Sequence, residues 1–134
     1  MRERRALQFV VAIACLVPIL TGLDGVLRGA AMFKLASFPA NLDSHFRYLS
    51  GIFLMMGFAF VSTIPAIEHQ GKRFRLLGAM VVMGGLARAL SWAAVGAPGY
   101  GHKFGLVMEL IVVPLLMLWQ ARVARLTSRD PTAR

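Results

Sequence analysis

Six charged side chains lie where long apolar runs of the sequence end or are interrupted: Asp24, Arg28, Asp43, Arg47, Arg88 and Glu109. A charge buried in a lipid bilayer is costly unless a partner compensates it, so charged residues at such depth are candidates for function. Carboxylates and guanidinium groups recognise polar ligands through charge-assisted hydrogen bonds. The chemistry expected from this set is therefore the binding of a polar ligand.

Arg88 and Glu109 are the two charges placed deepest in their runs. Counted at 1.5 Å per residue, Arg88 lies about 10 Å inside the outer end of its helix near Val95, and Glu109 about 9 Å inside from Lys103. The two helices follow each other along the chain and are antiparallel, so the two depths match. We predict an ion pair with two parallel hydrogen bonds, a geometry that arginine and carboxylate favour.

Polar and aromatic side chains flank these charges at the same predicted end of the helices. They are His45, Tyr48, Ser91, Trp92 and His102. The opposite halves of the four apolar runs contain no ionisable side chain except Cys15. An ion path through the membrane would need polar groups in both halves, so this asymmetry favours a ligand site open to the outer face.

Each candidate also has a structural interpretation, and the sequence leaves both open. Arg88 and Glu109 could fix only the register of two helices. Asp43 could cap the start of its helix, and Asp24 and Arg28 could form a pair at the membrane interface. His45 and His102 could be interface residues without a ligand.

Other chemistries have little support in the sequence. Haem and di-iron sites need histidines or Glu-x-x-His pairs inside the bundle, and the three histidines lie near helix ends or in a loop. We therefore predict no metal, no cofactor and no catalytic residue. A membrane-embedded enzyme with Glu109 or His45 as general acid or base is a less favoured alternative.

The composition indicates an integral membrane protein. Of 134 residues, 57% are hydrophobic and 16% are charged, whereas about 25% are charged in a soluble domain. Four apolar runs approach the roughly 20 residues that cross a bilayer. We predict an all-α antiparallel four-helix bundle in one domain, residues 1–134, with helices at about 7–27, 44–66, 74–96 and 103–123.

The net charge of +9 comes from basic residues at the ends of the apolar runs. Ten of them fall on one side: Arg2, Arg4, Arg5, Lys72, Arg73, Arg75, Arg122, Arg125, Arg129 and Arg134. The other side has Arg28, Lys34, Arg47 and Lys103. By the positive-inside rule, both termini are expected in the cytoplasm.

The basic residues do not form the single tract or face that nucleic acid requires, so no nucleic-acid partner is predicted.

Three motifs, "NLDSHFRYLSGIFL", "GGLARALS" and "ELIVVPLLMLWQ", resemble those of a family of small bacterial membrane proteins, the domain of unknown function 4345. The resemblance extends from the first helix through Gln120. It implies a four-helix protein of the bacterial inner membrane, without a known activity, substrate or catalytic residue. The motif residues overlap the polar set: Asp43, His45, Arg47, Arg88, Ser91, Glu109 and Pro114. A looser resemblance, to DoxX-type four-helix proteins, rests on hydropathy alone.

From these observations we predict an inner-membrane protein whose outer half binds a small molecule or a lipid head group in an ionic and aromatic pocket. The alternative from another class is an accessory or assembly subunit of a larger respiratory or photosynthetic membrane complex. In that case the same charges would only hold the fold together. Self-association into a homo-oligomer is a further open alternative.

Overall fold

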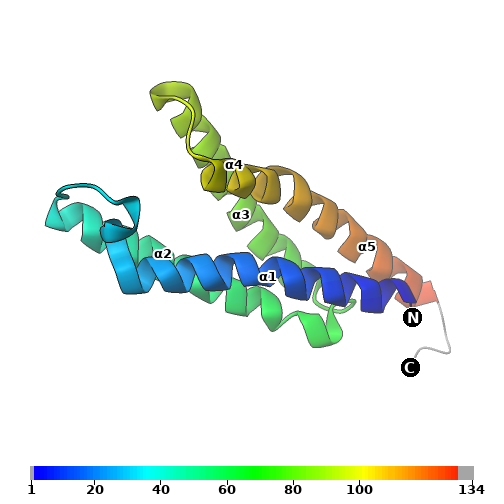
Figure 1. Cartoon of the computed structure of the whole chain (residues 1–134). Coiled ribbons are helices and arrows are strands. Elements are labelled where there is room, and N and C mark those ends of the chain that lie inside the picture. Colours follow the sequence, from blue (N-terminus) through cyan, green and yellow to red (C-terminus); the bar gives the residue numbers. More distant parts are fainter. Residues whose placement is uncertain (1, 130–134) are drawn as a thin grey trace. The chain divides into compact units, whose positions relative to one another are not determined.

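The fold of this protein, obtained as a computed structural model, is described for residues 2–129 and is built from four long helical segments (Figure 1). Helix α1 is Arg2–Arg28, α2 is Ala40–Val61 and α3 is Gly71–Val95. The fourth segment contains α4 (Tyr100–Val107), a π-helical turn η3 (Met108–Val112) and α5 (Val113–Arg129). Two short 3-10 helices, η1 (Gly29–Phe33) and η2 (Ile64–Ala66), follow α1 and α2. The described residues contain no strand, which confirms the all-α prediction.

The observed helix bounds differ from the predicted ones mainly at the polar ends. Helix α1 begins at Arg2, before the predicted residue 7, and the last segment runs on to Arg129, past the predicted 123. A helix satisfies its own backbone hydrogen bonds, so it can continue beyond the apolar run into the interface. Helix α2 instead ends early, at Val61, and Ile64–Ala66 winds separately as η2. Arg134, one of the ten basic residues on one side, lies outside the described residues.

The chain divides into two compact units. We call residues 8–64 the N-unit, and residues 1–7 together with 65–134 the C-unit. The boundaries fall within α1, after Leu7, and before Pro65. That the two units form a single domain stays a prediction.

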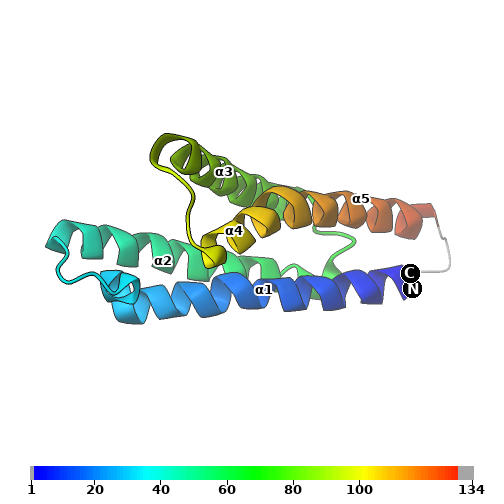
Figure 2. The ribbon, with the colours of Figure 1, turned by 45° about the horizontal axis from the view of Figure 1, so that its top comes forward.

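The N-unit is a hairpin in which α1 and α2 lie side by side and antiparallel (Figure 2). Gly22 of α1 lies directly against the backbone of Leu54, and Ile19 of α1 lies against Gly57. Small residues at these points allow close helix approach, which packing within a membrane requires because lipid supplies no hydrophobic drive for association. At the far end of the hairpin, Gln8 Nε2 donates to the Ile64 carbonyl over 2.7 Å.

The C-unit packs α3 against the fourth segment, and the two are antiparallel. Gly78 of α3 lies against Met117, and Gly85 lies against Leu110. Its buried apolar side chains come from α1, the link before α3, α3 and the fourth segment: Leu7, Ile67, Phe74, Leu77, Leu106, Leu116 and Val123. The C-unit therefore has its own core, which fixes the position of the polar residues on α3 and η3.

The outward faces of the helices are strongly apolar. Leu20, Met83, Leu90 and Leu118 are each more than 60% exposed. All four segments, Arg2–Phe33, Ala40–Ala66, Gly71–Val95 and Tyr100–Arg129, are long and apolar enough to cross a membrane. Apolar surface of this extent requires lipid or protein to cover it. The molecule is a multi-pass membrane protein.

Candidate functional site

The candidate site of the C-unit is built around a π-helical turn in the fourth segment. The Val113 N–H donates to the Met108 carbonyl, five residues earlier instead of four. Pro114 follows directly, and it has no amide proton to donate to the carbonyl of Leu110. A proline ring also clashes with the carbonyl four residues before it, and a wider turn relieves this conflict. Pro114 thus explains why the helix changes its winding at Glu109.

Gly85 allows α3 to approach this π-helical turn closely. A Cβ atom at Gly85 would lie 2.8 Å from Cβ of Glu109 and 2.7 Å from Cδ2 of Leu110, distances that no real side chain tolerates. The contact leaves Glu109 only 7% exposed. The carboxylate is therefore removed from solvent and needs a cationic partner.

Arg88 is that partner. Its Nε donates to Oε2 of Glu109 and its Nη2 to Oε1, each over 3.0 Å. This two-point geometry confirms the ion pair predicted from the matched depths of the two residues. The Arg88 side chain keeps 32% of its surface exposed, whereas that of Glu109 keeps 9%. Arg88, the cationic member of the pair, is therefore the more exposed of the two side chains.

His102 contacts the opposite edge of the same guanidinium. Its Nδ1 lies 2.6 Å from Nη1 of Arg88. Because a guanidinium can only donate, Nδ1 is the acceptor and the ring proton of the neutral imidazole lies on Nε2. We call Arg88, His102 and Glu109 the Arg88 cluster. Of the five N–H donors of a guanidinium, three are used by these contacts.

Lys103 and two aromatic rings lie beside this cluster on α3 and α4. The Lys103 ammonium is 5.6 Å from the Trp92 ring centroid and 5.3 Å from that of Tyr100, within the range of cation–π attraction. Lys103 and Tyr100 were absent from the predicted site, although their spacing of three residues on one helix could have indicated the contact. Ser91, a predicted site residue, is exposed on α3.

The N-unit holds the other predicted carboxylate–arginine pairs, and Asp43 organises the larger group. Its Oδ1 accepts the Ala30 N–H over 2.7 Å, and its Oδ2 accepts from Nε of Arg47 over 2.8 Å. Nη1 of Arg47 donates to the carbonyls of Val26 and Leu27, at the C-terminal end of α1. We call Ala30, Asp43 and Arg47 the Asp43 network. It joins the end of α1 to the first turns of α2.

The backbone at Gly29 makes the Asp43 network possible. Its φ of +57° lies in the left-handed region, which glycine adopts without strain. A Cβ atom there would also overlap Asp43 Oδ1 and the guanidinium of Arg47. The alternative prediction that Asp43 caps α2 is wrong: Pro39 occupies the N-cap position, and Asp43 binds the amide of Ala30 instead.

The remaining N-unit candidates form local contacts near the surface. Arg28 donates to both carboxylate oxygens of Asp24, one turn earlier on α1. This is the pair that the sequence predicted. The rings of His45 and Tyr48 stack with centroids 6.5 Å apart, and both side chains are exposed. Six predicted site residues thus belong to the N-unit and five to the C-unit, and their convergence into one pocket stays a prediction.

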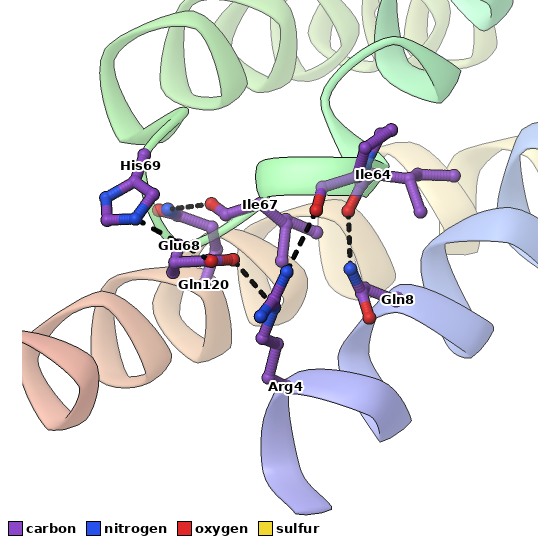
Figure 3. Close-up of polar contacts among 8 residues, drawn as sticks. Arg4, Gln8, Ile64, Ile67, Glu68, His69 and Gln120 are labelled. Carbon is purple, nitrogen blue, oxygen red and sulfur yellow. Dashed lines mark hydrogen bonds and ion pairs between the residues drawn. The ribbon is translucent and has the colours of Figure 1, made fainter. Parts of the chain in front are cut away.

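A second polar group in the C-unit was missed by the sequence analysis (Figure 3). Arg4 donates to the Pro65 carbonyl over 2.9 Å and pairs with Glu68 at 2.9 Å. The fully buried Gln120 donates to the Ile67 carbonyl over 2.8 Å. We call these residues the Arg4 network. Glu68 is the single acid in the link between α2 and α3, and this signal could have suggested a cationic partner.

The described residues contain no group of three His, Cys, Asp or Glu side chains placed to hold a metal ion. The arrangement at Arg88 is instead suited to hydrogen bonding. Arg88 and His102 offer N–H donors, and Glu109 holds the arginine side chain in place.

Four membrane-spanning helices with charged side chains inside apolar runs define a class, the small multi-pass helical membrane protein. Within that class the chain belongs to the family described as domain of unknown function DUF4345, which matches residues 6–120. No curated protein and no solved structure matches the chain. The resemblance to DoxX-type proteins has no support in these comparisons.

Proposed function

We propose that this protein binds a small anionic molecule or an anionic lipid head group at the Arg88 cluster. The proposal rests on how Arg88 is held by its neighbours and on how much of its side chain stays exposed. Glu109 and His102 hold its guanidinium from two edges, yet the side chain is 32% exposed and two of its N–H donors remain available. Together with Nε2–H of His102, these donors suit a ligand rich in acceptor oxygens, such as a carboxylate or a phosphate.

The surrounding charges support an anion over a cation. Glu109 neutralises Arg88, while Lys103 adds a positive charge close by and is held by Trp92 and Tyr100. Ser91 and Trp92, at i+3 and i+4 from Arg88 on α3, extend the same stripe. Both carboxylate oxygens of Glu109 accept from Arg88, an arrangement that favours anchoring the arginine over proton transfer to a substrate.

We also propose that the protein resides in a bacterial inner membrane with both termini in the cytoplasm. The support is the asymmetry of ten basic residues against four across the predicted membrane. Reporter fusions after Gln70 and Thr127 should read cytoplasmic, and fusions after Ser37 and Gly99 periplasmic. A periplasmic signal after Gln70 would contradict this orientation and place the Arg88 cluster toward the cytoplasm.

Native mass spectrometry of the gently extracted protein tests the binding proposal. We expect the wild-type protein to retain an added mass that fragments to an anionic molecule. His102→Ala keeps the Arg88–Glu109 pair but removes a donor, so it should lower retention, and Arg88→Gln should abolish it. His69→Ala, which changes an exposed histidine at the other end of the C-unit, is the matched control and should retain the mass.

A wild-type spectrum without added mass, or equal retention in all three variants, would contradict the proposal. An added protein subunit would instead support the accessory-subunit alternative. That alternative, self-association and the membrane-enzyme alternative stay predictions.

A further inference from the structure

One end of the C-unit carries a dense group of exposed cations. Three contacts bring the start of α1, the link before α3 and the end of α5 together there: Arg4 with Glu68, Glu3 with Arg122, and Gly71 beside Gln120. The exposed basic side chains on these segments and at the start of α3 are Arg2, Arg5, Lys72, Arg73, Arg75, Arg122, Arg125 and Arg129. We call this set the basic end.

The acidic residues at this end do little to offset that charge. Among the described residues they are Glu3 and Glu68. Glu68 is 6% exposed and pairs with Arg4, so its charge is neutralised within the fold. Glu3 binds one edge of Arg122, with Nε to Oε2 at 3.1 Å and Nη2 to Oε1 at 3.0 Å. Nη1 of Arg122 remains on the opposite edge, directed away from this pair.

An apolar groove lies beside Arg122. It is open, holds about 500 Å³, and is lined by Glu3, Leu118, Trp119 and Arg122. Leu118 is 69% exposed, on the membrane side of the charged residues. A tryptophan next to arginines at the end of a membrane helix is typical of the head-group level of a bilayer. The groove thus combines an apolar floor with the paired Arg122 and Glu3 at its rim, and it lies beside the exposed cations of the basic end.

We propose that the basic end binds anionic phospholipid of the adjoining leaflet, with the lipid phosphate at Arg122 and an acyl chain along Leu118 and Trp119. The net positive charge of the basic end distinguishes an anionic from a zwitterionic head group, because only the former has a net charge to attract. This site is separate from the Arg88 cluster and does not depend on the ligand proposed there.

The two tryptophans permit a direct test, since Trp92→Phe leaves Trp119 as the sole indole. The full-length variant is reconstituted in phosphatidylcholine vesicles that contain an equal fraction of brominated phosphatidylglycerol or brominated phosphatidylcholine. Bromine quenches indole fluorescence at short range. We expect a larger loss of Trp119 fluorescence with the brominated phosphatidylglycerol, and a smaller difference between the two lipids at high salt.

Charge variants in the same background locate the effect. Arg122→Gln with Arg125→Gln should remove the preference for phosphatidylglycerol. Arg28→Gln, an exposed arginine of the N-unit, and Arg88→Gln should keep it, which separates this site from the proposed ligand site. The salt dependence needs no charge substitution, so it tests the proposal even if the double variant fails to insert.

Equal quenching by the two brominated lipids would overturn the proposal. A preference that persists undiminished in the Arg122→Gln, Arg125→Gln protein would also overturn it.

Discussion

The Asp43 network and the Arg88 cluster are built from the same two groups, a carboxylate and an arginine, but they use them differently. In the Asp43 network, both side chains also bind backbone atoms: Asp43 accepts the Ala30 N–H, and Arg47 donates to the last carbonyls of α1. In the Arg88 cluster, the contacts are to two other side chains, Glu109 and His102.

This difference separates two roles that the sequence could not distinguish. A group bound to the backbone at a helix end satisfies polar atoms that would otherwise lack partners, which is a structural task. A buried carboxylate that holds an arginine with free donors prepares that arginine for a ligand. The Asp43 network therefore maintains the α1–α2 connection, whereas the Arg88 cluster is the better candidate for binding.

The largest expected effect is on the ion pair of the Arg88 cluster. Glu109→Ala leaves the Arg88 charge without its partner within the apolar region and should lower the free energy of unfolding in detergent by about 3 to 5 kcal/mol. Arg88→Ala should do the same. Denaturant titration monitored by tryptophan fluorescence measures both.

Combining the two substitutions sharpens this result. The double variant should lose less than the sum of the single losses, because the residues interact. The reversed pair, Arg88→Glu with Glu109→Arg, should recover part of the stability but not ligand retention. Strictly additive losses would show that Arg88 and Glu109 contribute no coupling energy. Glu109 would then not anchor Arg88, and the Arg88 cluster would lose the feature that distinguishes it from the Asp43 network.

A smaller effect is expected from the close approach of α3 to the π-helical turn. Gly85→Ala forces a Cβ atom against Glu109 and Leu110 and should cost about 1 to 3 kcal/mol, as overpacking does. The neighbouring Gly84 faces open space, with no atom within 4 Å of an added Cβ. Gly84→Ala should therefore cause no loss, and equal losses in the two variants would refute the contact.

The Asp43 network has its own test at Gly29. Gly29→Ala imposes a left-handed conformation on a residue with a Cβ, which costs about 1 to 2 kcal/mol, and it also displaces Asp43 and Arg47. Ligand retention at Arg88 should not change, because the network is assigned a structural role. Gly84→Ala, at a helical glycine with open space, is the control. If the Gly29→Ala protein lost ligand retention while its stability stayed unchanged, the structural role assigned to the Asp43 network would be wrong.

The smallest effect on stability is expected at Lys103. Lys103→Ala removes cation–π contacts with Trp92 and Tyr100 that are worth about 0.5 to 1 kcal/mol. We expect weaker ligand retention despite this small change, because the cation adds to the positive charge near Arg88. Thermal unfolding and native mass spectrometry on the same sample compare the two quantities. Full retention would exclude Lys103 from the site.

The sequence predicted a contact best where the depths of two residues in the membrane determined whether their side chains could meet. The Arg88–Glu109 pair could be predicted because both charges lie at similar depth in consecutive helices, and an unpaired charge there would be costly. The pairing of Asp24 with Arg28 followed from helical periodicity alone. In both cases the geometry was set by regular helices.

Contacts that depend on irregular backbone could not be predicted in the same way. Asp43 binds Ala30 because Gly29 turns the chain into a left-handed conformation, and no periodicity encodes that turn. Arg4 was assigned only to the basic flank of the first helix, and its pairing with Glu68 depends on how the α2–α3 link folds. The π-helical turn was also missed, although Pro114 inside an apolar run was its local cause.

The π-helical turn also sets the length of the fourth segment. Such a turn carries one residue more than the α-helical turn it replaces. If the segment wound as a regular α-helix with all of its residues kept, the extra residue would rotate every residue beyond it by about 100° relative to Tyr100–Val107. Gln120 would then turn away from Ile67 and Arg122 away from Glu3. The π-helical turn therefore absorbs the extra residue and keeps the helical phase between the Arg88 cluster and the basic end.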